Sequence, residues 1–167
     1  MRRRQVVVIG SSSASSEEQD ASYKIGRAVA QHGFVLITGG RGGVMEQASR
    51  GAKEAGGMVV GILPGESFDG ANKFCDVVIP TGIGYARNSV NVLAADLIIS
   101  VGGSSGTLSE IAYAWNYNKK IVACAYTGGW SGKLAGKPLD KRRTDTVIAA
   151  LCYEDVLYHL KRLQALS

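Results

Sequence analysis

The segment Val101–Glu110, which reads VGGSSGTLSE, constrains the fold and ligand chemistry of this chain more than any other stretch. It follows the β-branched apolar run 97–101 and leads into a run of helical periodicity at 108–117. A strand that enters a glycine-rich turn and then a helix presents unpaired backbone N–H groups and the positive end of the helix dipole. The segment therefore predicts an anion-binding turn, and we expect the ligand to carry a phosphate group.

Apolar runs alternate with amphipathic segments along the chain, a pattern typical of β-α units and a parallel sheet. We expect strands near 5–10, 34–38, 58–63, 77–80, 97–101, 121–126 and 147–151. Helices are expected from Ser15 or Ser16 to Gly33 and near 44–55, 86–95, 108–117 and 154–166, with a loop at 127–140. The pattern predicts an α/β fold: a three-layer αβα, Rossmann-like, doubly wound and mostly parallel sheet of about six to seven strands. No repeat or linker interrupts the sequence, so we expect a single domain over 1–167.

Three glycine-rich turns follow expected strands, after Ile9, after Thr38 and after Val101. Doubly wound sheets bind ligands at the carboxyl ends of their strands, in the crevice where the strand order reverses. We therefore expect the three turns to converge on one phosphate site. Its candidate ligand-binding residues are Gly10, Ser11, Gly39, Gly40, Arg41, Gly42, Gly43, Gly102, Gly103, Ser104, Ser105, Gly106 and Thr107.

Arg87 stands at the expected start of a helix, where the helix dipole disfavours a cation. A bound anion would reverse the sign of that interaction, and arginine suits bidentate recognition of phosphate. We interpret Arg87 as a phosphate ligand, with a solvated surface arginine as the alternative. Asn88 beside it is a candidate for hydrogen bonding to the ligand or to neighbouring loops.

Glu110 has two interpretations. The spacing Thr107-x-x-Glu110 is that of a capping box, in which the glutamate bonds back to the N-cap backbone. Alternatively, Glu110 faces the crevice one turn inside the phosphate site and orients a water or stabilises a cation that develops beside a bound sugar. The two histidines, His32 and His159, are remote from the glycine turns, so a carboxylate is the expected general base of any reaction.

Several classes of protein are not predicted. The chain has no His/Cys cluster with metal-ligand spacing and no G-x-S-x-G elbow, and the turn at 10–15 lacks the glycines of a dinucleotide fingerprint. We therefore expect no metal site, no hydride transfer and no cofactor needed for folding. The net charge of +5 is assigned to a solvated surface in preference to a nucleic-acid face, because no basic helix carries interleaved aromatics.

The location expected for the chain is the cytoplasm. No apolar stretch is long enough to span a bilayer, and the apolar run after Arg2–Arg4 is too short for a signal peptide. Cys75, Cys124 and Cys152 are odd in number and lie in or beside apolar segments, so they are predicted to be buried, reduced thiols. We expect no membrane partner.

Five segments in order carry a family resemblance: TGGRGGVM (38–45), GAKEAGG (51–57), GILPG (61–65), GIGYARN (82–88) and GGSSGTLSE (102–110). Over about 6–125 the chain resembles the molybdenum cofactor carrier proteins. These belong to a Rossmann-like superfamily with the LONELY GUY (LOG) phosphoribohydrolases, some members of which were labelled lysine decarboxylases. The resemblance implies a phosphorylated ligand, either a nucleotide or a pterin such as a carried molybdenum cofactor, and a homo-oligomer, dimer or tetramer. Tyr113 and Trp115 are interpreted as core in preference to an oligomer interface.

The phosphoribohydrolases carry a P-G-G-x-G-T-x-x-E motif and an upstream arginine in an M-x-x-R-K segment. The resemblance places Glu110 and Arg87 on the catalytic glutamate and arginine. Three departures surround them: Val101 replaces the motif proline, 104–105 adds a residue before Gly106, and 86–88 lacks the usual flanking residues. We therefore favour a binding protein. The alternative is a hydrolase that frees the base and ribose 5-phosphate from a nucleoside 5′-monophosphate, in which Arg87 fixes the substrate and Glu110 supports water attack.

Overall fold

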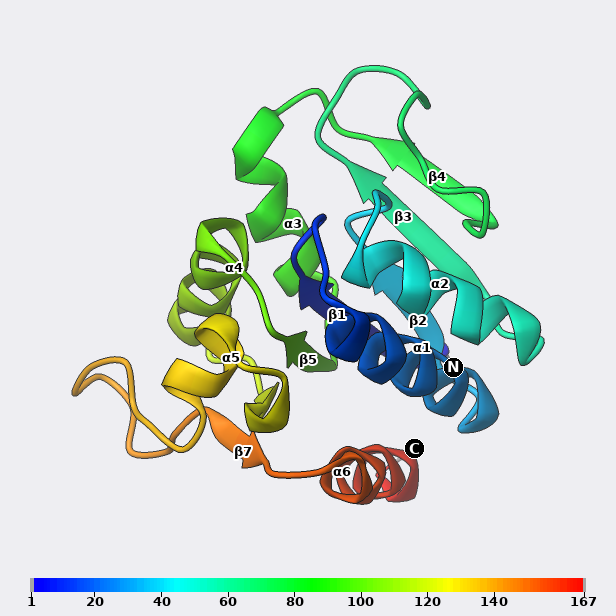
Figure 1. Ribbon diagram of the computed structural model, residues 1–167. Helices are drawn as coiled ribbons and strands as arrows, with labels where there is room; N and C mark the ends of the chain where they lie inside the picture. The colour runs from blue at the N-terminus through cyan, green and yellow to red at the C-terminus, as the bar shows by residue number, and fades with distance from the viewer. Residues whose placement is uncertain (1, 167) are drawn as a thin grey trace.

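In the computed structural model of the protein, which describes residues 2–166, seven strands form one sheet in the order β4-β3-β2-β1-β5-β6-β7 (Figure 1). Every neighbouring pair is parallel. The expected Rossmann-like, doubly wound sheet is confirmed. The strands are β1 (Gln5–Gly10), β2 (Val35–Thr38), β3 (Val59–Leu63), β4 (Val77–Pro80), β5 (Leu97–Val101), β6 (Ile121–Cys124) and β7 (Ile148–Ala150).

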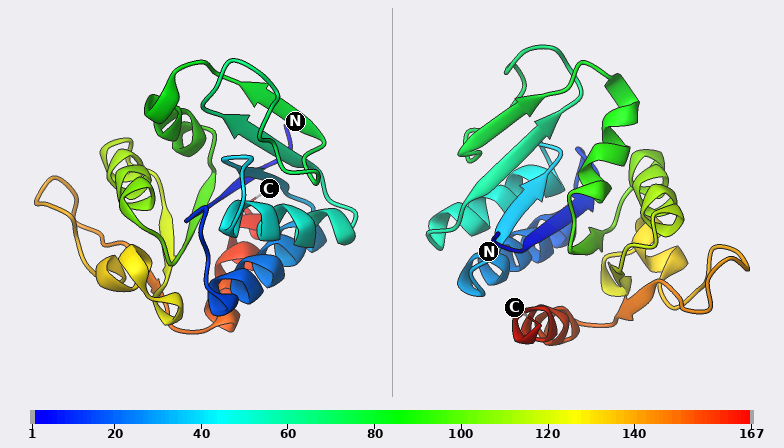
Figure 2. Two further views of the ribbon diagram at one scale, coloured as in Figure 1. Left: turned by 45° about the horizontal axis from the view of Figure 1, so that its top comes forward. Right: turned by 180° about the vertical axis from the view of Figure 1, so that it is seen from behind.

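Helices cover both faces of the sheet, which gives three layers (Figures 1 and 2). Alternate residues along a strand point to opposite faces, so Val6 and Val8 pack in one core and Val7 and Ile9 in the other. The first core is covered by α1 (Ser16–Gln31), α2 (Val44–Glu54) and α6 (Tyr153–Ala165). The second is covered by α3 (Arg87–Leu93) and α4 (Ser105–Asn116), with α5 (Gly129–Leu134) at its side.

The strand order reverses between β1 and β5, because β2 to β4 follow one another on one side of β1 while β5 to β7 lie on the other. In sheets of this kind a crevice opens outside the carboxyl ends of the strands at the reversal. The turns after β1 and β5 border that crevice, and the turn after β2 lies next to them.

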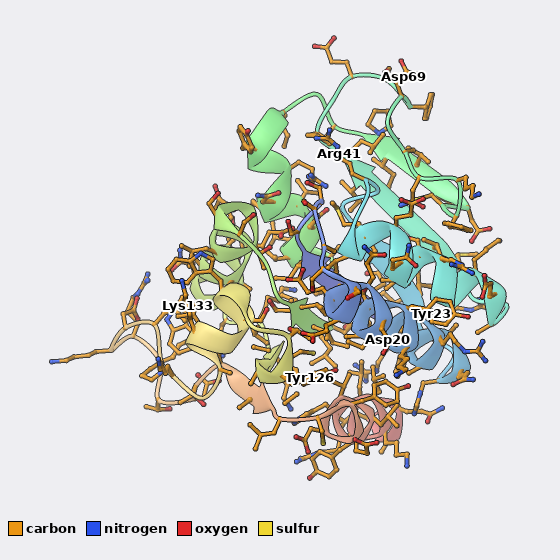
Figure 3. All side chains as sticks on the ribbon, in the orientation of Figure 1. Asp20, Tyr23, Arg41, Asp69, Tyr126 and Lys133 are labelled. Carbon is orange, nitrogen blue, oxygen red and sulfur yellow. The ribbon has the colours of Figure 1, made fainter. Side chains whose placement is uncertain are left out.

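Two expectations about the second half of the chain are wrong. Helix α4 begins at Ser105, three residues before the expected start, because Gly102 and Gly103 reverse the chain with φ values of +51° and +100°. The expected loop at 127–140 contains the helix α5, which follows the short 3₁₀ helix η2 (Ala125–Thr127). In α5, the ammonium group of Lys133, which is labelled in Figure 3, lies over the ring of Trp130.

The burial of individual side chains confirms some of the expectations and contradicts others. Trp115 is buried, so its assignment to the core is confirmed. Cys124 is buried, but Cys152 is exposed, because it is the N-cap of α6 and stands outside both cores. Its expected burial is therefore wrong, and Cys75 is only partly buried. Within the described residues, no helix is both long and apolar enough to cross a membrane.

Candidate functional site

A cavity of about 310 Å³ lies at the crevice, where the turns after β1, β2 and β5 meet. Helices α3 and α4 and the short 3₁₀ helix η1 (Gly84–Ala86) complete its wall. Arg41, labelled in Figure 3, reaches its edge from the turn after β2. The lining residues are Gly10, Ser11, Ser12, Arg41, Met45, Tyr85, Arg87, Asn88, Ser104, Ser105, Gly106, Thr107 and Glu110.

Six glycines that were candidates for ligand binding lie behind the cavity lining: Gly39, Gly40, Gly42, Gly43, Gly102 and Gly103. Two of them make room for the side chains and backbone that form the wall. A Cβ on Gly39 would lie 2.2 Å from Nη1 of Arg87, and one on Gly43 would lie 2.3 Å from the carbonyl oxygen of Ser11. These glycines therefore shape the site through close packing.

The Arg87 side chain is fixed at the base of the cavity by the ends of two strands. Its Nη1 donates to the carbonyl oxygen of Gly39 at 2.8 Å and to that of Ile62 at 2.7 Å. The side chain is buried, so the alternative of a solvated surface arginine is wrong. Burial lowers the pKa of Arg87, while the charge of Glu110 acts in the opposite direction.

The capping-box interpretation of Glu110 is wrong. The N-cap of α4 is Ser104, and Thr107 lies inside the helix. The Glu110 carboxylate is buried and accepts a hydrogen bond from Nδ2 of Asn91 at 3.2 Å. Burial raises the pKa of Glu110 to about 7, against the opposing effects of the Asn91 hydrogen bond and the Arg87 charge. The group therefore changes its charge near neutral pH.

Three buried polar atoms in this region have no hydrogen-bond partner among the described residues: Nε of Arg87, Oδ1 of Asn91 and Oγ1 of Thr107. Leaving such an atom unpaired costs about 1–3 kcal/mol. Arg87 and Thr107 line the cavity, and Asn91 contacts Glu110 directly behind it. A polar ligand in the cavity would supply partners for the two of these side chains that line it, Arg87 and Thr107.

The side-chain amide nitrogen of Asn88 is bonded within the protein. Its Nδ2 donates to Oγ of Ser109 at 2.8 Å, which ties α3 to α4 beside the cavity. The Asn91–Glu110 bond ties the same two helices one turn further along. Asn88 thus positions the cavity wall, as its second interpretation allowed, although it bonds a helix and not a loop.

The β5–α4 turn has a second side, which faces α1 and η2. The N–H of Gly103 donates to Oε1 of Glu18 at 3.2 Å, and that of Gly102 to Oγ1 of Thr127 at 2.7 Å. Two donors of the glycine turn are therefore satisfied within the protein. Residues 105–107 form the first turn of α4 and line the cavity, and N–H groups in a helix's first turn have no partner within the helix.

Sequence reasoning missed four residues of this region. Glu18 has the signature of a first-turn acid, and Thr127 follows a strand without further signal. Met45 and Tyr85 line the cavity beside predicted residues, and the position of Tyr85 two residues before Arg87 was the one available sign. Within 2–166, no group of three or more His, Cys, Asp and Glu side chains is arranged to hold a metal ion.

Residues 3–154 match the family described as LDcluster4, the SLOG cluster4 family. An uncharacterized protein of Archaeoglobus fulgidus is 48% identical over 102 residues, which are 61% of this chain and 67% of that protein. The structure of the molybdenum cofactor binding protein from Rippkaea orientalis is 35% identical and superimposes with a TM-score of 0.87 over 98% of each chain. The molybdenum cofactor carrier protein of Chlamydomonas reinhardtii is 33% identical, with a TM-score of 0.85 over 98% of this chain and 99% of that one.

Proposed function

The chain belongs to the SLOG cluster4 family, and from that premise we propose that it binds a phosphorylated small ligand, a nucleotide or a pterin of the molybdenum cofactor type. The observation that carries this proposal is the set of buried, unpartnered polar atoms at the cavity. The similar structures from Rippkaea orientalis and Chlamydomonas reinhardtii support the pterin as ligand. A volume of about 310 Å³ lies at the small end of ligand cavities and suits one mononucleotide or one phosphorylated pterin.

In this proposal the phosphate binds at the first turn of α4. The N–H groups of 105–107 donate to its oxygens, and the helix dipole favours its charge. Oγ1 of Thr107 gains the partner that it lacks. Arg41 supplies a cation at the cavity edge, and Arg87 supplies a second one from its base.

Two threonines provide a matched test of the binding proposal. Thr107→Val removes an unpartnered hydroxyl, whereas Thr127→Val removes one that accepts from Gly102 and donates to Cys124. Calorimetric titrations would use GMP and 6-hydroxymethylpterin phosphate, each beside its phosphate-free counterpart. We expect Thr107→Val to weaken binding of the phosphorylated compounds about tenfold without loss of stability.

Thr127→Val should bind the same compounds within about twofold of the parent and unfold about 1 kcal/mol more easily. The proposal fails if no phosphorylated compound binds the parent protein, or if phosphate-free counterparts bind equally well.

A specific observation favours a second candidate, the nucleoside 5′-monophosphate phosphoribohydrolase. Glu110 lies buried at the cavity with a pKa of about 7, which suits a general base at neutral pH. In the reaction, water adds to C1′ of the ribose as the N-glycosidic bond breaks, and the base leaves with the bonding electron pair. Glu110 takes a proton from the water and gives it to the departing base, so the carboxylate is regenerated. The products are the free base and ribose 5-phosphate.

Product analysis separates the two candidates. The protein is incubated with AMP, GMP, CMP or IMP, and free base and ribose 5-phosphate are resolved by chromatography. Release by the parent and a loss of at least a hundredfold in Glu110→Gln would establish the hydrolase. Binding of a nucleotide without release of its base would support the carrier function and exclude the hydrolase.

We also propose that the chain forms a homo-oligomer through α3 and α4. Val90 and Leu93 on α3 and Tyr117, the C-cap of α4, are large apolar side chains that are exposed on this packed helix pair. Leu93→Lys places a charge in this surface and should yield monomers in light scattering, while Leu151→Lys, on another exposed apolar residue, should not. A monomeric parent protein would exclude the oligomer.

The cytoplasm is the compartment that we propose. Cys75, Cys124 and Cys152 are all free thiols in the structure. Free thiols of this kind persist in a reducing compartment. Recovery of the native protein in an extracellular or membrane fraction would contradict this assignment.

A further inference from the structure

Tyr85 is the most exposed large apolar side chain of the described residues, at 92%, and it lines the cavity. The turn that precedes it is bonded to the last residue of β3 and to the two residues that follow. The N–H groups of Thr81, Gly82 and Gly84 donate to the carbonyl oxygens of residues 63, 65 and 64, at 2.9–3.1 Å. An aromatic ring is thus displayed to solvent at the cavity wall by a fixed turn, which favours a binding role over simple mobility.

The chemistry of the lining divides into two parts. Ser104 to Thr107 and the arginines supply N–H groups, hydroxyls and positive charge. Met45 and Tyr85 supply the large apolar side chains of the lining, from α2 and η1. Flat aromatic rings bind well against tyrosine faces and methionine thioethers. The two parts together fit a ligand with a phosphate at one end and a planar ring at the other.

We propose that Tyr85 is a stacking platform for the ligand's aromatic heterocycle, which it holds together with Met45 while the phosphate binds at α4. This inference rests on the proposed binding function and narrows its ligand class. It selects phosphorylated heterocycles, such as purine nucleotides and pterin phosphates, over phosphates of simple sugars. Tyr85 is then a specificity residue, and it contributes binding energy only to ligands that carry an aromatic ring.

The test compares phosphates that carry an aromatic ring with one that does not, on variants of exposed tyrosines. Dissociation constants of GMP, 6-hydroxymethylpterin phosphate and ribose 5-phosphate are measured for the parent, Tyr85→Ala, Tyr85→Phe and the control Tyr158→Ala. The pterin phosphate has no N-glycosidic bond, so the hydrolase reaction cannot consume it. Tyr158 is an exposed tyrosine on α6, away from the cavity lining.

We expect Tyr85→Ala to raise the dissociation constant of at least one of GMP and 6-hydroxymethylpterin phosphate about tenfold. The dissociation constant of ribose 5-phosphate should stay within about twofold of the parent's. Tyr85→Phe and Tyr158→Ala should bind as the parent does. Equal loss of affinity for ligands with and without an aromatic ring, or no loss for either, would overturn the inference while the binding function stands. Failure of every phosphate to bind the parent would overturn both.

Discussion

The two sides of the β5–α4 turn carry similar residues in opposite states. Toward α1, Glu18 accepts from the backbone N–H groups of Ser15 and Gly103, and Thr127 accepts from that of Gly102. Toward α3, Glu110 is buried with one amide donor described, and the hydroxyl of Thr107 has no partner. A glutamate and a threonine thus bond the turn on one side, while on the other side the same two residue types are buried with fewer partners.

This difference shows why residue type alone does not identify a site. The first pair, Glu18 and Thr127, accepts hydrogen bonds from backbone N–H groups that the turn leaves unpaired. These bonds therefore stabilise the folded state. The opposite pair, Glu110 and Thr107, is desolvated without full compensation by hydrogen bonds, which lowers stability. Proteins keep such unfavourable arrangements mainly at functional sites. Substitutions should therefore lower stability on the α1 side and alter binding or pH behaviour on the α3 side.

The largest expected effect is that of Gly103→Ala on the turn itself. Gly103 has a φ of +100°, and a Cβ there would lie 2.5 Å from the side chain of Thr107. Strain and overlap together should lower the free energy of unfolding by about 4 kcal/mol, measured by urea denaturation. Gly106→Ala, where a Cβ would meet nothing within 4 Å, is the control and should not destabilise the protein. Equal stability of the two variants would remove the role assigned to the turn.

The next effect concerns Glu110 and has a definite sign with pH. Its pKa is about 7 in the folded protein against an ordinary value of 4.5, so between these values the unfolded chain loses the proton first. The parent therefore loses stability as pH rises through this window, by about 3 kcal/mol in total. Glu110→Gln removes that loss.

Denaturation of parent and Glu110→Gln at a series of pH values measures this prediction. The two should be similar at pH 4, and the variant should be about 3 kcal/mol more stable at pH 8. A difference that does not change with pH would show that Glu110 does not titrate in this range.

The smallest effect is on the opposite glutamate. Glu18→Ala removes the capping box of α1 and the acceptor for Gly103, and should lower stability by about 1–2 kcal/mol. Glu17→Ala, its exposed neighbour, keeps both bonds and should stay within about 0.5 kcal/mol of the parent. If Glu18→Ala were as stable as Glu17→Ala, the two sides of the turn would not differ as described.

The sequence predicted the parallel sheet and the convergence of three glycine turns, because both follow from local periodicity and connection rules. The strand order, and with it the reversal between β1 and β5, comes from the structure. The sequence also predicted that Arg87 and Glu110 lie at one site, and both line the cavity. It did not reveal that the donors on one side of the turn are already bonded, since Glu18 accepts from Gly103 across 85 residues of sequence. The exposure of Tyr85 likewise depends on tertiary hydrogen bonds to the end of β3.

A backbone amide titration by NMR tests whether the two sides of the β5–α4 turn have separate roles. The ligand added is 6-hydroxymethylpterin phosphate or GMP, and the amide signals of the turn are followed. We predict large shifts for Ser105, Gly106 and Thr107 and small ones for Gly102 and Gly103, whose N–H groups are already bonded. The largest shifts at Gly102 and Gly103, with 105–107 unchanged, would contradict the account.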